Sequence, residues 1–349
     1  MKVGKKTSVL IVDDSALARQ ILTDMISADP DLEVAGVARD GVEAVRLTKE
    51  LEPDVITMDI HMPEMDGLSA LEYIMKSYPR PVVMVSALVK KGAEPTLKSL
   101  ELGAVDFIAK PNQYPTSIAE VREDVIRKIK AAAGSRAKEI WSRPRGLKPP
   151  ESLKVDRASV RGGRMVVIGA SAGGPRALSA IIPALPGDLP ASIVIVQHMP
   201  EQFTSSFAQR LDSHAGLRVR EAAQGEEFAE GRAVVVPGGR DLTFDKAGGR
   251  VRARLTPTVA RHGASPVIDV TMESAARVYG ERCVGVILSG MGSDGAMGLG
   301  MIRDAGGETM AQSEETCLVY GMPRAAIEKR FADEVVPLDR MAAAIISRL

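Results

Sequence analysis

The chain has 349 residues, and its 45 Lys and Arg balance its 45 Asp and Glu, so the formal net charge is zero. This balance argues against bulk electrostatic attraction to nucleic acid, and no apolar run reaches the roughly 20 residues of a membrane span. The length predicts two domains, and 45% hydrophobic residues suffice for two cores. Cys283 and Cys317 are expected to be buried, reduced thiols, which suits a cytoplasmic protein.

Short, β-branched apolar runs occupy residues 9–12, 55–58, 82–85 and 104–108, and amphipathic segments such as 15–26 lie between them. Continuous runs of this kind are typical of strands covered on both faces, as in a parallel sheet. Their alternation with amphipathic segments predicts a doubly wound α/β domain. The site of such a domain lies at the carboxyl ends of its strands.

Polar residues follow these runs at the predicted strand ends. Asp13, Asp14 and Asp59 are expected to converge there, and three close carboxylates are unfavourable unless a cation joins them. Mg²⁺ prefers oxygen ligands and fits such a cluster. Asp59 could attack a phosphoryl donor to give an acyl phosphate, while Ser86 and Lys110 hold the phosphoryl oxygens. Asp13 and Asp14 taken alone could equally cap the helix that follows them.

With these polar residues at the predicted strand ends, residues 7–128 resemble a response-regulator receiver domain. The matching positions are Asp13-Asp14, Asp59, the MPEMDG sequence at 62–67, Ser86-Ala87 and Lys110-Pro111. The resemblance implies that Asp59 is the phosphoacceptor. It also implies that Asp14 is the main carboxylate ligand of Mg²⁺, with Asp13 nearby and the backbone carbonyl of residue 61 completing the protein ligands.

The same resemblance assigns the sensing of the phosphoryl group to three residues. Ser86 and Lys110 are expected to contact its oxygens. Phe107 falls at the aromatic switch position of the family, and ordinary core packing is an equally good account of this side chain. A histidine kinase is the implied phosphodonor.

The composition changes after the helix expected at 118–132. Residues 131–162 are rich in Gly, Pro, Ser, Lys and Arg, and their prolines cannot continue a helix. We predict an interdomain linker there, between a receiver domain at 1–130 and a second domain at 163–349. A solvated hinge is favoured over a polyanion contact because the positive charge is spread out. Trp141, its one aromatic residue, is expected to dock against one of the two domains.

The second domain opens with the strand-like run 165–168, the sequence GASAGGP at 169–175 and a helical segment at 176–185. The order strand, glycine-rich turn, helix again predicts a doubly wound parallel sheet. The string satisfies the pattern G-x-S-x-G, in which a tight turn exposes the oxygen of Ser171. A phosphate-binding loop at a helix N-terminus is the competing interpretation of this segment.

Two later strand-like runs change the balance between these interpretations. Residues 192–196 are followed by His198, and residues 284–288 lead to Asp294. Parallel strands bring both side chains to the same sheet edge as Ser171. Ser, His and Asp are the nucleophile, the base and the orienting group of one catalytic arrangement. Their order along the chain differs from that of α/β-hydrolases, so the turn does not indicate that fold family.

Two of these assignments have alternatives. His198 is favoured as the base over His262, whose loop could edge the cleft, and over His214, which lies in a polar stretch. Asp294 could instead cap the helix that follows it. The orienting role is favoured because Gly290 and its neighbouring glycines keep that loop free of bulk.

Residues 164–349 resemble the catalytic domain of the CheB family of chemotaxis protein-glutamate methylesterases. The matching stretches are 168–175, 197–200, 237–239, 289–298 and 320–323. The resemblance implies a hydrolase that removes methyl groups from glutamate γ-methyl esters on chemoreceptor signalling helices and releases methanol. It implies activation by phosphorylation of Asp59 from a chemotaxis histidine kinase, and related enzymes also deamidate receptor glutamines.

The implied mechanism places a nucleophile at Ser171 and a general base at His198. Backbone N–H groups at Ala172 and at Met291 or Gly292 are expected to stabilise the oxyanion. Enzymes of this family often carry Thr after the nucleophile, and Ala172 lacks the hydroxyl that could help to orient His198. No metal-binding constellation appears in the second domain, so Mg²⁺ in the receiver is the one cofactor expected.

Two other functions of the second domain are possible alternatives. A DNA-binding output is disfavoured by the zero net charge and by the absence of a compact helix-turn-helix pattern after the linker. A nucleotide-binding output that uses residues 169–175 is disfavoured because a Walker A loop requires a Lys, and none follows Gly174. We therefore expect neither nucleic-acid binding nor membrane insertion.

Overall fold

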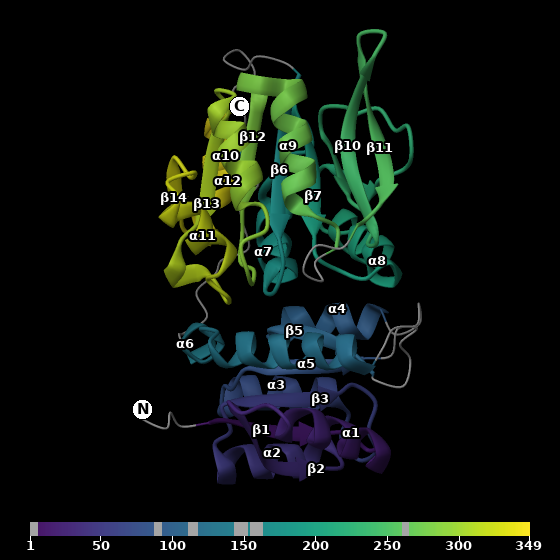
Figure 1. Cartoon of the computed structure of the whole chain (residues 1–349), viewed down its shortest axis with the longest axis vertical. Helices are drawn as coiled ribbons and strands as arrows, with labels where there is room; N and C mark the ends of the chain where they lie inside the picture. Colours follow the sequence, from purple (N-terminus) through teal and green to yellow (C-terminus); the bar gives the residue numbers. More distant parts are fainter. Residues whose placement is uncertain (1–5, 87–92, 111–117, 143–152, 154–162, 260–264) are drawn as a thin grey trace. The chain divides into compact units, whose positions relative to one another are not determined.

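The computed structural model describes residues 6–86, 93–110, 118–142, 153, 163–259 and 265–349 (Figure 1). The chain divides into two compact units, Met1–Arg145 and Gly146–Leu349. Each unit is built on a parallel sheet that carries helices, which confirms the predicted α/β class with two doubly wound domains. Within the described ranges, every helix is too short or too polar to cross a membrane.

The first unit alternates strands and helices. Its elements are β1 Thr7–Val12, α1 Ala16–Ser27, β2 Leu32–Ala38, α2 Gly41–Leu51, β3 Val55–Asp59, α3 Gly67–Ser77, β4 Val82–Ser86, α4 Ala93–Leu102, β5 Asp106–Ala109, α5 Ile118–Ala133 and α6 Ala137–Ser142. The strand order in the sheet is β2-β1-β3-β4-β5, with all described pairs parallel. Helices α1 and α5 pack together, as do α2, α3 and α4 in succession. The four apolar runs predicted to be strands are confirmed.

The start of α1 decides between two predicted roles for the aspartates after β1. Ser15 caps this helix, because its hydroxyl accepts a hydrogen bond from the Ala18 N–H at 3.3 Å. Asp13 accepts from the Ser15 N–H at 2.9 Å, one residue before the helix begins. Neither Asp13 nor Asp14 is therefore the capping residue, and both carboxylates are placed at the strand end.

The structure differs from the sequence prediction at the start of the linker. Helix α5 continues to Ala133 and α6 follows it, so residues 131–142 of the predicted 131–162 linker are folded and belong to the first unit. The prolines that exclude a helix begin only after this segment. Helix α6 packs on α3, and this tertiary contact was not visible in the local composition.

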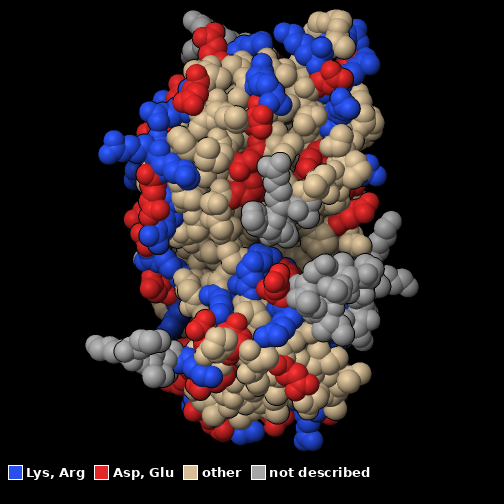
Figure 2. Space-filling view, in the orientation of Figure 1, with Lys and Arg blue, Asp and Glu red and all other residues tan. Residues whose placement is uncertain are grey.

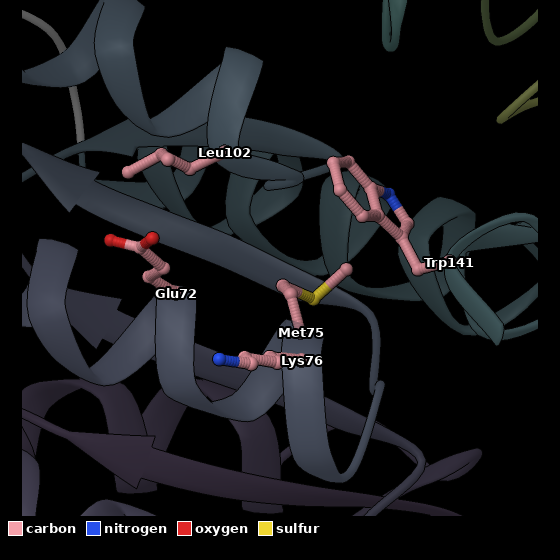
Figure 3. Close-up of a pocket in the computed structure, with 5 residues that line it drawn as sticks. All are labelled: Glu72, Met75, Lys76, Leu102 and Trp141. Atoms are coloured by element: carbon pink, nitrogen blue, oxygen red, sulfur yellow. The ribbon is translucent and has the colours of Figure 1, made fainter. Parts of the chain in front are cut away.

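Trp141 joins α6 to the rest of the first unit. Its indole lies against Gly103, where an added Cβ would meet the ring at 2.8 Å. Together with four other residues it lines a pocket of about 390 Å³, and the set is Glu72, Met75, Lys76, Leu102 and Trp141 (Figure 3). The expectation that Trp141 docks against one of the domains is confirmed. No predicted site residue lines this pocket.

The second unit contains a seven-stranded sheet in the order β14-β13-β12-β6-β7-β9-β8 and a two-stranded antiparallel hairpin. Its elements are β6 Arg164–Ala170, α7 Gly174–Ile181, β7 Ala191–Gln197, α8 Glu201–Asp212, β8 Arg218–Glu221, β9 Arg232–Val235, β10 Arg240–Ala247, β11 Arg250–Pro257, α9 Ile268–Tyr279, β12 Cys283–Ile287, α10 Ala296–Asp304, β13 Glu308–Gln312, α11 Met322–Glu328, β14 Glu334–Val336 and α12 Leu338–Ser347, with short 3₁₀ turns at Ile182–Ala184, Gly280–Arg282 and Glu314–Thr316. Helices α9 and α10 pack together, the β10–β11 hairpin packs on α9, and α7 packs with α12.

The core of the second unit is mainly aliphatic, with the buried aromatic side chains of Phe203, Phe207 and Phe244 among it. Both cysteines are free and buried, and burial raises the pKa of the Cys283 thiol to about 12, so it is a protonated, inert core group at neutral pH. On the face shown in Figure 2, side chains of both charge signs are interspersed, as the zero net charge leads one to expect.

Gly67 is required where α3 begins against the end of β3. An added Cβ at Gly67 would lie 1.9 Å from the carbonyl oxygen of Asp59, a backbone atom that cannot move aside cheaply. We expect Gly67→Ala to lower the free energy of unfolding of the first unit by about 2 kcal/mol. Trp141, the single tryptophan, lies in this unit, so its fluorescence in a urea titration measures the change.

Gly134→Ala is the matched control for this substitution. An added Cβ there has its nearest neighbour at an ordinary 3.7 Å, so a change within about 0.5 kcal/mol is expected. Equal stability of the two variants would contradict the steric account.

Candidate functional site

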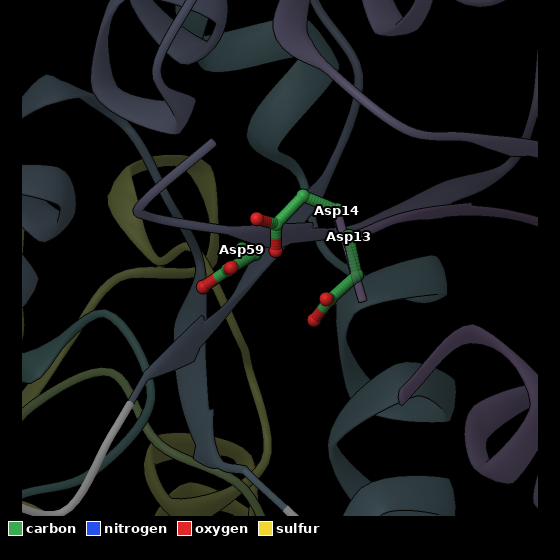
Figure 4. A group of neighbouring side chains, drawn as sticks. All are labelled: Asp13, Asp14 and Asp59. Carbon is green, nitrogen blue, oxygen red and sulfur yellow. The ribbon is translucent and has the colours of Figure 1, made fainter. Parts of the chain in front are cut away.

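The first candidate site lies at the carboxyl ends of β1 and β3. These strands are neighbours in the sheet, with Val12 beside Met58, so the residues that follow Val12 come next to Asp59. Ligand oxygens from Asp13, Asp14 and Asp59 all lie within 4.8 Å of one another (Figure 4). The predicted convergence of three carboxylates is therefore present in the structure.

Lys110 provides the positive charge of this cluster. Its Nζ lies 2.7 Å from Asp59 Oδ2 and 3.4 Å from Asp13 Oδ2. Burial by itself would lower the pKa of Lys110, but its hydrogen bond to Asp59 and the charge of that carboxylate outweigh burial, and the pKa is raised. The ammonium therefore remains charged and is fixed beside the predicted phosphoacceptor.

The carboxylates also have capacity for a cation. Asp13 is fully buried, and its Oδ2 has Lys110 as an ion-pair partner but accepts no hydrogen bond. Burial raises the pKa of Asp13, and the charge of Asp59 contributes in the same direction. A buried carboxylate oxygen of this kind is stabilised by a hard divalent cation. The donor set of Asp13, Asp14 and Asp59 therefore fits Mg²⁺.

The other predicted receiver residues lie on the adjacent strands. Ser86 is the last residue of β4, is buried, and has its hydroxyl 2.6 Å from that of Thr96. Phe107 lies inside β5 and is buried, so it packs in the core in this structure. The Nζ of Lys128 lies 5.5 Å from the centroid of the Phe107 ring and donates a hydrogen bond to the Phe107 carbonyl at 2.8 Å.

The second candidate site lies where three parallel strands end. Strands β12, β6 and β7 are consecutive in the sheet. Ser171 follows β6, His198 follows β7, and the loop that carries Asp294 follows β12. The sheet therefore brings the three predicted residues to one edge, as the sequence pattern indicated.

The closest contact in this site joins the imidazole and the carboxylate. His198 Nε2 lies 2.8 Å from Asp294 Oδ2. Burial would raise the pKa of Asp294, but the hydrogen bond and charge of His198 and two backbone hydrogen bonds outweigh it, and the pKa is lowered. Asp294 is thus held as a carboxylate that can orient the ring and stabilise its protonated form.

Asp294 also caps a helix, but not the helix that was weighed as an alternative. It accepts from the Ile268 N–H at 2.8 Å and from the Asp269 N–H at 3.0 Å, both at the start of α9. The following helix, α10, has Gly295 at its N-cap position, with no side-chain cap. Capping and orientation are therefore compatible in this side chain.

Ser171 lies in a tight turn between β6 and α7. Its N–H donates to the Ser289 carbonyl at 3.0 Å, and its own carbonyl accepts from the Gly174 N–H at 2.7 Å. Gly173 has φ of +76°, a left-handed conformation that favours glycine. The turn holds the Ser171 side chain at the strand end, with 8% of the residue exposed to solvent.

Ser171 and His198 follow neighbouring strands, but no hydrogen bond joins their side chains. Both residues are described, and their side chains form no hydrogen bond with each other. Because Nε2 faces Asp294, Nδ1 is the ring nitrogen left for a hydroxyl. Catalytic hydrogen bonds are often longer in a free enzyme than in its complex with substrate.

The predicted oxyanion donors lie in the turn that contains Ser171 and in the loop that follows β12. The backbone N–H groups of Ala172, Met291 and Gly292 donate to no acceptor among the described residues. Gly290 lets this loop approach, since an added Cβ there would lie 2.9 Å from the Ser171 Cβ. These N–H groups are therefore free to bind a substrate oxygen.

Gln197 is a residue of this site to which the sequence pattern assigns no role. Its Nε2 donates at 3.0 Å to the carbonyl of Ser171 and also to that of His198. One buried amide thereby fixes the backbone of both residues. The available signal was its place immediately before His198 at the end of β7.

Two further residues around the site were missed. Ser289 Oγ donates to the Ala172 carbonyl at 2.7 Å and accepts from the Val319 N–H at 3.0 Å, so it ties the serine turn to a third segment. Asp269 lies in the first turn of α9 beside Asp294. An acidic residue soon after Pro266 is a helix-start signal that could have drawn attention to it.

The other histidines are accounted for differently. His214 is exposed and its Nδ1 lies 2.9 Å from the Arg210 carbonyl, outside this site. His262 lies outside the described residues.

Comparisons with known proteins support the interpretation of both halves of the chain. Residues 166–345 match the family model described as CheB methylesterase, and residues 9–122 match the model of the response regulator receiver domain. A Pyrococcus abyssi protein named protein-glutamate methylesterase/protein-glutamine glutaminase is 45% identical over 344 residues, which cover 98% of this chain and 94% of that protein.

A second relative and a solved structure support the same assignment. A Carboxydothermus hydrogenoformans protein named protein-glutamate methylesterase/protein-glutamine glutaminase 2 is 46% identical over 349 residues, covering 98% of each chain. The crystal structure of the Thermotoga maritima CheB methylesterase catalytic domain matches with a TM-score of 0.53 and 42% identity, and covers 54% of this chain and 100% of that one. The chain therefore belongs to the CheB methylesterase family, and its N-terminal part is a response regulator receiver domain.

Proposed function

We propose that this chain is a phosphorylation-regulated hydrolase that removes methyl groups from glutamate γ-methyl esters of chemoreceptors. The observation that carries the proposal is the His198–Asp294 pair beside Ser171, in a chain whose relatives are named for this activity. Deamidation of receptor glutamines uses the same acyl chemistry and belongs to the proposal, with ammonia as the leaving group. The enzyme acts in the cytoplasm on receptor signalling helices.

The geometry of the second unit supports the following acyl-transfer step. Ser171 Oγ attacks the ester carbonyl carbon while His198 accepts the hydroxyl proton at Nδ1. Asp294 stabilises the imidazolium through Nε2, 2.8 Å away. Collapse of the tetrahedral intermediate breaks the bond to the methoxy group, which takes the proton from His198 and leaves as methanol.

Water completes the cycle. It attacks the acyl-enzyme while His198 again accepts a proton, and Ser171 is regenerated when the glutamate carboxylate leaves. In both tetrahedral intermediates the oxyanion is stabilised by the N–H groups of Ala172 and of Met291 or Gly292. A donor of this kind contributes about 3 kcal/mol to the lowering of the barrier.

Phosphorylation of the receiver controls this activity. An oxygen of Asp59 attacks the phosphorus of a phosphohistidine on a chemotaxis histidine kinase. The N–P bond breaks, the kinase imidazole leaves, and the Asp59 carboxylate becomes an acyl phosphate. Lys110 and Ser86 hold the phosphoryl oxygens, and Phe107 changes its packing in response. Asp13, Asp14 and Asp59 would hold Mg²⁺, which supplies positive charge to the transferring phosphoryl group.

Ser171→Ala tests the nucleophile. We expect at least a thousandfold loss of methanol release from methylated receptor membranes, because the hydroxyl that would form the acyl-enzyme is removed. Uptake of phosphate at Asp59 should be unchanged. Ser213→Ala removes an exposed hydroxyl of the same unit and should retain full activity. Full activity of Ser171→Ala would overturn the assignment.

Asp59→Asn tests the regulation. The variant lacks the carboxylate nucleophile, so we expect no phosphate uptake and no increase in methanol release when a small-molecule phosphodonor is added. Basal release should persist. Asp24→Asn, which changes an exposed carboxylate on α1, should respond like the wild type. A stimulated Asp59→Asn variant would place the control elsewhere.

Asp13→Asn tests the metal site. Loss of one buried negative charge should weaken Mg²⁺ binding at least about tenfold in a calorimetric titration. Phosphate uptake should stop when EDTA is added to the wild type. Unchanged Mg²⁺ affinity in this variant would exclude Asp13 from the site.

A further inference from the structure

Helices α9 and α10 begin side by side. A carboxylate at the start of each helix accepts hydrogen bonds from backbone N–H groups at the start of the other helix. Asp294, just before α10, accepts from the N–H groups of Ile268 and Asp269 in α9 at 2.8 and 3.0 Å. Asp269, in the first turn of α9, accepts from the Gly298 N–H of α10 at 2.7 Å. The two side chains thus form a reciprocal cap, and each depends on the other for its position.

The close fit of the two helices makes this arrangement rigid. An added Cβ at Gly298 would meet Asp269 Cα at 3.1 Å and the Met272 Cβ at 2.6 Å. The backbone of Asp269 is therefore held against α10, and the hydrogen bond from the Gly298 N–H holds its side chain. Its carboxylate stays next to Asp294, and Asp294 stays 2.8 Å from His198.

Among the residues that the structure describes, few charged groups lie around Asp269. Helix α10 offers it backbone N–H groups, since residues 296–302 carry no charged side chain. Strand β10 contributes Asp241, which accepts from the Val267 N–H at 2.8 Å. On α9 itself, Glu273 is one turn away and paired with Arg277. Strands β6, β7 and β12 end in uncharged residues. His198, which follows β7, bonds to Asp294.

We propose that Asp269 is a positioning residue of the esterase site, which fixes Asp294 against His198 and, by gaining or losing a proton, sets the charge that acts on this pair. The inference rests on the proposed function. Asp269 is not one of the three predicted catalytic residues Ser171, His198 and Asp294. The proposal is that it nevertheless influences the pH dependence of the esterase activity.

The electrostatic environment of Asp269 supports titration in the working range. Burial raises the pKa of Asp269 to about 6, and the nearby charge of Asp294 adds to the increase. Well above pH 6 the site holds two carboxylates, which favour the positive charge that His198 acquires during attack. Below that pH Asp269 is protonated and this second charge is lost, although its hydrogen-bonded position is retained.

Asp269→Asn separates charge from position. The amide can still accept from Gly298 through its oxygen, but it stays uncharged at every pH. We expect the acid limb of the kcat/KM profile for methanol release to move by about half a unit to lower pH. The plateau kcat should fall about fivefold, because the imidazolium loses a favourable charge. Asp269→Ala should lose more, since the positioning contact is also removed.

The thermal stability gives a readout that does not depend on activity. An acid whose pKa is raised by folding contributes stability at low pH, and that contribution is lost as the pH rises through the folded-state value of about 6. Asp269→Asn avoids this loss. Its Tm relative to the wild type should therefore rise as the pH increases from about 4 to about 6, and should then stay constant up to pH 8.

The experiment measures both quantities on the full-length chain with phosphodonor and Mg²⁺ present. Glu273→Gln, which removes a paired carboxylate farther along α9, is the charge control and should leave both profiles unchanged. An Asp269→Asn variant with wild-type profiles would overturn the inference. If the wild type released no methanol but the Tm difference appeared, the proposed function would fail while the titration of Asp269 in the reciprocal cap stood.

Discussion

The Asp294 carboxylate binds three donors: His198 and the first two N–H groups of α9. A helix N-terminus favours negative charge, so the start of α9 adds to His198 in keeping this carboxylate ionised. Among the described residues, neither Lys nor Arg forms an ion pair with Asp294. The direction of the imidazole follows from this contact, because its Nε2 is committed to Asp294. The orientation of the base is therefore a consequence of how α9 and α10 pack on the sheet.

The receiver stabilises its carboxylates in a different way. Asp13, Asp14 and Asp59 meet at the ends of two strands, and the positive charge comes from the Lys110 side chain rather than from a helix end. An ammonium compensates only part of this negative charge, so the cluster retains capacity for a divalent ion. Parallel strands produce both sites, and the local source of positive potential distinguishes the proposed cation site from the proposed esterase site.

For residues that follow the apolar strand runs, a place in a site could be predicted from the sequence. The reason is that neighbouring parallel strands end at the same edge of the sheet. Ser171, His198 and Asp59 are of this kind. Asp269 could not be found in this way, since its partner Asp294 is distant in sequence and the two meet only through helix packing. Helix α6 was missed for a similar reason: its docking through Trp141 on Gly103 is a tertiary contact within a segment of linker-like composition.

We propose that the two halves of the chain form one regulated esterase. The most direct test measures methanol release by the wild-type chain from methylated receptor membranes, with Mg²⁺, before and after addition of a small-molecule phosphodonor. The account predicts a low basal rate that rises as Asp59 becomes phosphorylated. A chain that accepts phosphate at Asp59 and releases no methanol in either condition would contradict it.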